Sequence, residues 1–151
     1  MKNLLERNKI IHFTTKNKNT AIDKLASPTN YLIQVSLNNF KVNIYTGKQG
    51  GWKLIRQYSC TIGKPSTPTP RGNFSIGEKG PYFGVNKGYK CLYYTQFSGD
   101  YLFHSIVYNL DGSVRDGRLR MRLSNGCIRL ATEHAKWIYH TIPKGTKVVI
   151  Q

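Results

Sequence analysis

Apolar and polar residues alternate along the chain from residue 31 onward, which is the period of a half-buried strand. The alternation is clear in YLIQVSL (31–37), FKVNIY (40–45) and WKLIRQYSC (52–60), which are enriched in β-branched residues. LNNF and TGKQGGW separate these segments and contain the Asn and Gly residues that favour turns. The pattern predicts three consecutive strands, with a hairpin between the first two and a longer loop before the third.

Further strands are predicted in the second half of the chain. CLYYTQF (91–97) and YLFHSIVY (101–108) read as adjacent strands, with SGD as the tight turn between them. TKVVI at 146–150 reads as a closing strand. Residues 63–77, GKPSTPTPRGNFSIG, hold three prolines before a strand, and proline removes backbone donors and stiffens the chain. This segment therefore predicts an ordered surface loop.

One helix stands out near the C-terminal end. EHAKWIYHTI (133–142) has helical character, Thr132 is placed to cap it, and the sequence PKG ends it. We expect His134 and His140 on its solvent side. Residues 1–30 have weak periodicity and end in the turn-forming ASPTN, so they read as a basic lead-in or linker. The expected organisation is this lead-in followed by one mostly β domain over residues 31–151.

The charge of the chain narrows the classes of partner. There are 23 Lys and Arg residues against 7 Asp and Glu residues, which gives a formal net charge of +16. Such an excess favours a polyanionic environment: nucleic acid, an acidic membrane surface or an anionic wall polymer. No apolar run is long enough for a transmembrane helix, and the N-terminal residues lack the apolar stretch of a secretory signal.

The three cysteines differ in their surroundings. Cys60 and Cys91 fall in strand segments on either side of the proline loop, and they leave open a disulfide or two free thiols. Cys127 follows a glycine in LSNGCIRL (123–130) and precedes Arg129 by two positions. No CxxC or Cys/His spacing typical of a zinc site is present.

A cysteine nucleophile needs a base or cation, access, and donors for the oxyanion that it creates. Gly126 lets the backbone turn sharply, Ser124 can brace that turn through its hydroxyl, and the N–H groups of residues 125–127 can point into one pocket. Arg129 shares a face with Cys127 in an extended chain, where it would meet a substrate carboxylate or lower the thiol pKa. The alternative is that Cys127 is a small buried hydrophobic residue.

The base must come from elsewhere, and His104 in YLFHSIVY is the best candidate. In a single strand it shares a face with Leu102 and Ile106, opposite Ser105 and Val107. The alternative is a core histidine satisfied by a backbone carbonyl.

A resemblance to a known family adds to the case for Cys127 and His104. HS at 104–105 and SNGCIRL at 124–130 resemble the signature of the L,D-transpeptidase (YkuD-like) catalytic domain: a histidine, a spacer, then Ser/Thr-His-Gly-Cys, an apolar residue and Arg or Asn. The proline loop matches the family's G-x-x-x-x-x-T-P-x-G element, and IPKGTKVVI resembles its closing strand. The resemblance covers about residues 30–151. Asn125 stands where the family usually has histidine, which keeps a hydrogen-bonding side chain but removes a titratable one.

The resemblance implies a β-sandwich with one or two short helices and a groove covered by part of 78–90 or 108–120. It implies an extracytoplasmic acyltransferase of the cell wall that needs no metal or nucleotide cofactor and forms 3→3 cross-links between peptidoglycan stem peptides. Carbapenems would inhibit it, and its charge would suit anionic wall polymers better than nucleic acid. The implied roles are Cys127 as nucleophile, His104 as base, the Ser105 carbonyl as its orienter, Asn125 and Gly126 at the oxyanion hole, and Arg129, Ser124 and Tyr94 along the substrate channel.

Two rival hypotheses remain open from the sequence. The same fold with water as acceptor would be an L,D-carboxypeptidase. A non-catalytic module that binds the wall or another polyanion would instead use a stripe of arginines at positions 115, 118, 120 and 122.

Overall fold

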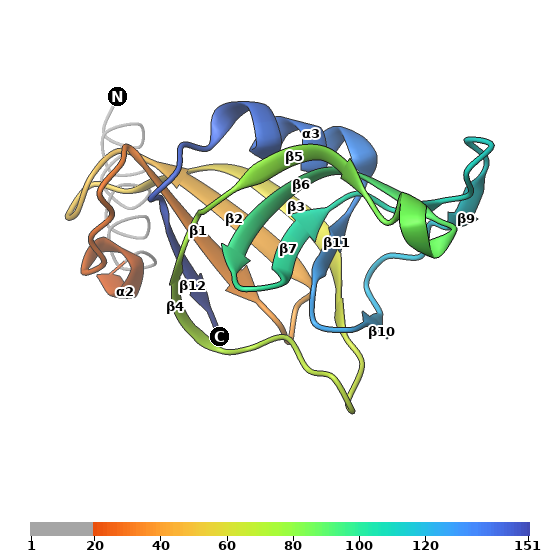
Figure 1. The fold of residues 1–151 in the computed structure, drawn as a ribbon. Coiled ribbons are helices and arrows are strands. Elements are labelled where there is room, and N and C mark those ends of the chain that lie inside the picture. The colour runs from red at the N-terminus through yellow and green to blue at the C-terminus, as the bar shows by residue number, and fades with distance from the viewer. Residues whose placement is uncertain (1–19) are drawn as a thin grey trace, which may run out of the picture.

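The computed structural model describes residues 20–151, so most of the predicted lead-in, residues 1–19, lies outside the described residues. Strands dominate the described part, and short helices complete it (Figure 1). The strands are β1 (Tyr31–Ser36), β2 (Lys41–Thr46), β3 (Lys53–Gly63), β4 (Gly72–Ser75), β5 (Lys79–Phe83), β6 (Lys90–Ser98), β7 (Tyr101–His104), β8 (Val107–Tyr108), β9 (Val114–Asp116), β10 (Arg122–Ser124), β11 (Ile128–Leu130) and β12 (Lys147–Ile150). The helices are α2 (Thr20–Asp23), the 3-10 turn η1 (Val85–Lys87) and α3 (Thr132–Thr141).

All the described strands belong to one mixed sheet, with the order β4-β12-β1-β2-β3-β11-β7-β6-β8-β9, while β10 pairs with β3 and β5 with β6. The predicted hairpin between β1 and β2 is confirmed, as are the turn between β6 and β7 and the closing strand β12. β12 lies parallel to β1, and β11 lies parallel to β7. The expected mostly β class is correct. The two layers of the expected β-sandwich are parts of one continuous sheet.

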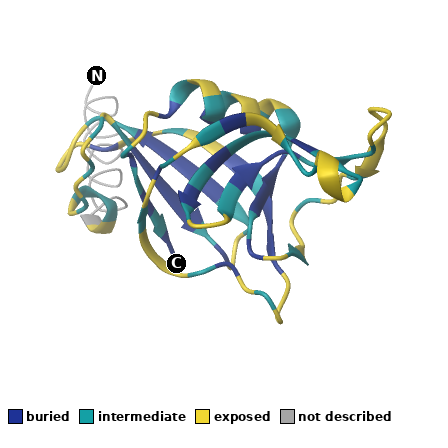
Figure 2. Cartoon of the chain, viewed as in Figure 1, coloured by how far each residue is buried: buried dark blue, intermediate teal, exposed yellow. Residues whose placement is uncertain are grey.

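The sheet curls so that distant strands share one core. Phe74 of β4 meets Phe97 of β6 edge to face, with ring centroids 5.7 Å apart, although six strands lie between β4 and β6 in the sheet order. Phe97 in turn packs against Phe103 of β7 at 5.0 Å. Figure 2 shows the buried residues concentrated along the strands and the exposed ones in the connecting loops. The apolar face of the curved sheet therefore encloses the core.

Helix α3 lies across the sheet and buries Ala135 and Ile138 in that core. Its N-cap is Ala131, which makes no side-chain capping hydrogen bond, so the expected Thr132 cap is wrong. The Thr132 hydroxyl instead lies 2.6 Å from the Tyr108 hydroxyl of β8.

The expected solvent position is correct for His140 and wrong for His134. The His134 ring stacks on the ring of Tyr58 with centroids 3.9 Å apart, and its Nδ1 atom is buried. The helix therefore turns this histidine toward β3 instead of solvent.

Residues 20–30 contact the domain that follows them. Ile22 and Leu25 pack against a small second cluster, and the Trp52 indole donates a hydrogen bond to the Leu25 carbonyl at 2.8 Å. The boundary at residue 30 stays a prediction. Within residues 20–151, no helix combines the length and the apolar character that a bilayer crossing requires.

The segment expected to be one strand over residues 101–108 is two. β7 ends at His104, and β8 begins at Val107 and pairs with β6. The break has a local cause, because the Ser105 hydroxyl accepts a hydrogen bond from the Leu92 N–H at 2.7 Å and donates one to the Ile106 carbonyl at 2.7 Å.

The cysteines are all free thiols, so the disulfide alternative for Cys60 and Cys91 is not the one found. Both side chains are buried, and burial raises the pKa of each thiol to about 12.

Candidate active site

The glycine before Cys127 is required by its backbone. Gly126 has φ 119°, and a Cβ atom there would lie 2.4 Å from the Tyr101 ring. The predicted brace is confirmed, because the Ser124 hydroxyl accepts from the Gly126 N–H at 3.1 Å and donates to the Cys127 carbonyl at 2.6 Å. The Gly126 N–H thus donates to the Ser124 hydroxyl and is not free to bind an oxyanion. The expected set of three oxyanion donors therefore loses this member. The N–H groups of Asn125 and Cys127 remain as candidate donors.

The proline loop fastens this turn from the other side. Thr69 is buried, and its hydroxyl donates a hydrogen bond to the Gly126 carbonyl at 2.9 Å. The same oxygen accepts from the N–H of Gly63, at the end of β3, also at 2.9 Å. One hydroxyl thus ties the loop and a central strand to the residue before the cysteine.

The Cys127 sulfur lies against the β6–β7 turn. It accepts a hydrogen bond from the Leu102 N–H at 3.4 Å, and its thiol donates a weak one to the Asp100 carbonyl at 3.5 Å. Burial raises the pKa of the Cys127 thiol, the Leu102 hydrogen bond opposes that rise, and the Asp100 charge adds to it. Of the two roles expected for Arg129, lowering this pKa is not the one found, because the pKa is set by burial, Leu102 and Asp100.

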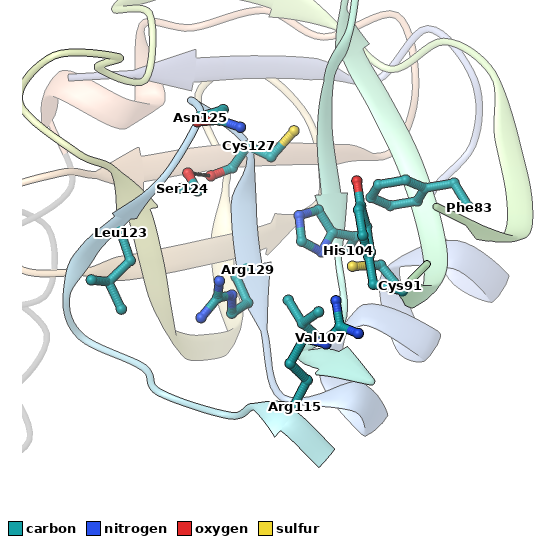
Figure 3. Close-up of a pocket in the computed structure, with 11 residues that line it drawn as sticks. Phe83, Cys91, His104, Val107, Arg115, Leu123, Ser124, Asn125, Cys127 and Arg129 are labelled. Atoms are coloured by element: carbon teal, nitrogen blue, oxygen red, sulfur yellow. Dashed lines mark hydrogen bonds between the residues drawn. The ribbon is translucent and has the colours of Figure 1, made fainter. Parts of the chain in front are cut away.

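His104 is placed beside the cysteine by the pairing of parallel strands. Arg129 of β11 is the register partner of His104 of β7, and Cys127 lies two positions before Arg129. Register partners point to one face, and so do alternate residues of an extended chain. The side chains of Cys127 and His104 consequently face the same space, as Figure 3 shows.

The tautomer and charge of His104 follow from its surroundings. Its Nδ1 lies 2.6 Å from the Ser105 carbonyl, the contact expected from the sequence. A carbonyl oxygen only accepts, so Nδ1 carries the proton and Nε2 keeps its lone pair. Burial lowers the pKa of His104 to about 4; the Ser105 hydrogen bond opposes this shift and the Arg129 charge adds to it. The imidazole is therefore neutral at physiological pH and able to accept a proton.

Cys127 and His104 open into a cavity of about 280 Å³, here called the first hollow. Five of the residues singled out in the sequence line it: Cys127, His104, Arg129, Ser124 and Asn125. Its other lining residues are Phe83, Tyr89, Cys91, Val107, Arg115 and Leu123. Val107, expected on the face opposite His104, joins it here because the strand breaks between them.

Arg129 is nearly inaccessible, with 7% of its surface exposed. Its Nη1 forms an ion pair with Asp116 Oδ1 at 3.2 Å, and the same Asp116 also pairs with Arg118 at 3.0 Å. These two arginines hold the pKa of Asp116 well below its usual range. The Arg129 Nε is buried without a hydrogen-bond partner, and Arg129 is one of the residues that line the first hollow.

A second hollow of about 550 Å³ is also lined by Cys127. It shares Phe83, Tyr89 and Cys127 with the first hollow. Its remaining lining residues are Glu78, Lys87, Tyr94, Gln96, Gly99, Asp100 and Leu102. Tyr94, expected along the substrate channel, lines this second hollow.

Both segments expected to cover the groove contribute to it. Phe83 and Tyr89 come from residues 78–90, and Arg115 comes from residues 108–120. The Arg115 guanidinium donates to the Gly88 carbonyl at 2.9 Å, which joins the two segments at one end of the sheet (Figure 1). The Phe83 ring meets the His104 ring edge to face at 5.1 Å and covers the base.

Sequence reasoning did not single out Phe83, Tyr89 or Thr69 as site residues, and it named Arg115 only for the rival binding hypothesis. The only signal for Thr69 was its position in the proline loop, and the other three lie in segments with no catalytic spacing.

The arginines of the rival binding hypothesis have separate contacts. Arg115 lines the first hollow, Arg118 pairs with Asp116, and the Arg122 guanidinium lies over the Phe40 ring at 5.8 Å. Arg115, Arg118 and Arg122 thus lie in three different environments, in β9, in the loop after it and in β10.

Comparison with known proteins identifies the family to which the chain belongs. YciB of Bacillus subtilis, provisionally named an L,D-transpeptidase, is 38% identical over 89 residues, which are 54% of this chain and 46% of YciB. The crystal structure of a fused Zn-dependent amidase/peptidase/peptidoglycan-binding domain-containing protein from Clostridium acetobutylicum is 41% identical. It matches with a TM-score of 0.74 over 91% of this chain and 58% of that one.

L,D-transpeptidase 3 of Mycobacterium tuberculosis, solved with a faropenem-derived adduct, shares the fold at 18% identity. Its TM-score is 0.59, with 81% of this chain and 60% of that chain covered. The chain thus spans about half of YciB and somewhat more of the solved structures. Residues 30–150 match the L,D-transpeptidase catalytic domain family, YkuD, and this chain belongs to that family.

Proposed function

We propose that this chain is a peptidoglycan L,D-transpeptidase that forms 3→3 cross-links through a thioester on Cys127. The observation that carries the proposal is the placement of Cys127 and His104 on one face of two parallel strands, both open to the first hollow. The neutral His104, with Nδ1 held by the Ser105 carbonyl, presents Nε2 as the proton acceptor.

The first step transfers the stem peptide to sulfur. As the Cys127 sulfur attacks the carbonyl carbon of the third stem residue, its proton passes to His104 Nε2, so no resting thiolate is needed. The N–H groups of Asn125 and Cys127 stabilise the oxyanion, and Thr69 and Ser124 hold the turn that aims them. The C–N bond then breaks, and the terminal D-alanine leaves with the proton from His104.

The second step resolves the thioester. A side-chain amine of a second stem attacks the same carbonyl carbon, the C–S bond breaks, and sulfur regains its proton. With water in place of the amine, the site releases a tripeptide and acts as an L,D-carboxypeptidase. The amine and water reactions share every catalytic group, so their products distinguish them.

The setting of the reaction follows from its substrate. Stem peptides belong to the bacterial cell wall, so the domain acts outside the cytoplasmic membrane. Its +16 charge favours residence among the anionic polymers there over binding to nucleic acid.

The decisive experiment is intact-mass detection of a covalent carbapenem adduct, followed by peptide mapping. We expect one adduct per chain, located on Cys127 and absent from Cys127→Ala. Cys91→Ala is the matched control, because Cys91 lines the same hollow but is 2% exposed. It should still form the adduct. An adduct on Cys91 or Cys60, or none at all on the wild-type protein, would contradict the proposal.

Product analysis then identifies the acceptor. Disaccharide tetrapeptides incubated with the protein should yield a dimer together with free D-alanine, and both should disappear in Cys127→Ala. A monomeric tripeptide as the only product would assign the carboxypeptidase reaction instead.

A further inference from the structure

The two hollows that share Cys127 in their linings differ in charge. The first hollow is lined by the exposed Arg115, by Arg129, which is paired with Asp116, and by no acidic residue. The second is lined by Glu78 and Asp100, two of the seven acidic residues in a chain with 23 basic ones, together with Lys87. The two hollows therefore offer different electrostatic environments next to Cys127 for the two reactants of the proposed reaction.

The first hollow is suited to a carboxylate. Arg129 lines it but is buried, and its guanidinium is paired with Asp116. The Arg115 guanidinium comes from the opposite segment and is exposed. The exposed Arg115 guanidinium favours the free carboxylate of a donor peptide, so the donor stem is assigned to the first hollow.

Of the two acids in the second hollow, Asp100 is nearer the chemistry. It lies in the β6–β7 turn, where its backbone carbonyl accepts from the Cys127 thiol at 3.5 Å. Glu78 is neutralised by Lys144 at 2.6 Å. Asp100, by contrast, forms no ion pair with any residue in the range 20–151 that the structure describes.

A negative charge next to the nucleophile works against the first step. The Asp100 carboxylate raises the pKa of the Cys127 thiol, which disfavours any thiolate. In the second step the same charge has the opposite effect, because the incoming acceptor is an ammonium group at neutral pH. The electrostatic cost to acylation is offset when the carboxylate draws this cation toward the thioester.

We propose that the second hollow is the binding site for the primary amine of the acceptor, and that Asp100 selects an amine over water. The proposal rests on the proposed function. The ammonium pairs with the Asp100 carboxylate and loses a proton to bulk water. Its free lone pair forms the C–N bond as the C–S bond breaks. The amine then gives up its second proton to His104, and the departing sulfur takes that proton back.

The test compares Asp100→Asn with wild type on a tetrapeptide donor and increasing concentrations of an acceptor stem with a free side-chain amine. We expect the apparent KM for the acceptor to rise about two- to fivefold, the range for an exposed ion pair, and the dimer-to-tripeptide ratio to fall by the same factor. The rate of carbapenem adduct formation should stay the same or increase, because the thiol pKa falls. Added salt should shrink the difference between the two proteins.

Glu133→Gln is the matched control, since Glu133 is an exposed acid in the first turn of α3 and lines neither hollow. It should leave the acceptor KM and the product ratio unchanged. Asp100→Glu should restore much of the wild-type ratio, which a structural role of the turn would not predict.

The outcomes separate this inference from the proposed function. If Asp100→Asn forms the adduct normally and keeps the wild-type acceptor KM and ratio, the inference is overturned and the transpeptidase stands. If Asp100→Asn loses acylation and transfer in equal measure, Asp100 serves the turn and the inference is again overturned. If the wild type forms no acyl-enzyme, both proposals fail together.

Discussion

The Thr69 hydroxyl donates a hydrogen bond to the Gly126 carbonyl at 2.9 Å, 57 residues along the chain. It also accepts one from the Gly63 N–H, so a single buried oxygen joins β3, the proline loop and the cysteine turn. The function of the proline loop is thereby explained in physical terms. It orients the backbone around Cys127 and does not itself need to touch the substrate.

Thr69→Val should impair the site more than the fold. Valine keeps the shape but leaves the Gly126 carbonyl and the Gly63 N–H unpaired, at a cost of about 1–3 kcal/mol in the free energy of unfolding. Because the turn that carries the oxyanion donors loosens, the rate of carbapenem adduct formation should fall about tenfold or more. Thr69→Ser keeps the hydroxyl and should retain most of the activity. Equal rates for the serine and valine variants would contradict this role.

The thiol of Cys127 should show a raised pKa when it is probed without the help of a substrate. Burial raises its pKa above the ordinary value near 8.5, so the thiolate fraction at pH 7 is small. Alkylation by iodoacetamide should therefore be slow at pH 7 and rise steadily toward pH 9 and above. Cys60 and Cys91, each with a pKa of about 12, should remain unlabelled. Fast labelling of Cys127 at pH 6 would instead indicate a preformed thiolate–imidazolium pair.

The features of this site that could be predicted from the sequence are those that depend on residues close together in the chain. Alternation identified β1 and β2, and the Gly-Cys spacing singled out Cys127, because both signals lie within a few residues. The ion pair of Arg129 with Asp116 joins two separate strands, and nothing in the spacing of these residues indicates it. Lowering the thiol pKa was one of two roles expected for Arg129, and the pKa of Cys127 is instead set by burial, the Leu102 N–H and Asp100.

Breaks and caps were also hard to predict. YLFHSIVY reads as one strand because its apolar pattern is unbroken, and the interruption is produced by hydrogen bonds of the Ser105 hydroxyl to two other backbone groups. Thr132 is a good capping residue by composition, yet its hydroxyl contacts Tyr108. In both cases a tertiary contact overrode a local preference.

The pH dependence of acylation should report on His104. Its pKa is lowered to about 4, so the neutral base is present above that pH and is lost as the pH falls through it. The rate of carbapenem adduct formation should thus have an acid limb near pH 4 to 5, below the limb near 6.5 of an ordinary histidine. His104→Gln removes the base and should lower the rate at pH 7 by about 10²–10⁴-fold. An acid limb near pH 6.5 in the wild type would show that His104 is not buried neutral.

Folding stability should respond to the same group. The folded pKa of His104 is about 4 and the unfolded value is near 6.5, so between these values the unfolded chain binds more protons. The free energy of unfolding therefore rises with pH across this window, by about 1–3 kcal/mol. Urea denaturation at pH 4.5 and pH 7 should reveal the rise, and His104→Gln should reduce it. Carboxylates such as Asp116 also make the free energy of unfolding rise with pH, but at lower pH. That second rise should persist in His104→Gln.

Asp116→Asn tests whether the buried arginine must be held in place to act on substrate. Asp116 accepts ion pairs from Arg129 and Arg118, and its lowered pKa keeps it charged well below pH 4. The two ion pairs therefore stabilise the fold at pH values above the pKa that Asp116 has in the unfolded chain. This contribution is lost as the pH falls toward the lower pKa of Asp116 in the folded protein. In the variant the Arg129 guanidinium is left buried without its anion, at a cost of about 1–3 kcal/mol in stability.

The effect on catalysis should depend on the size of the substrate. Arg129 is expected to hold a carboxylate of the donor stem, so loss of its anchor should raise the KM for a tetrapeptide donor about fivefold. Adduct formation with a small carbapenem, which depends on Cys127, His104 and the oxyanion donors, should change less than twofold. Arg118→Gln is the control, because it removes the other partner of Asp116 and leaves the pair with Arg129 intact. If both variants raise the donor KM equally, the effect belongs to the loop as a whole and Arg129 has no separate role in binding the donor.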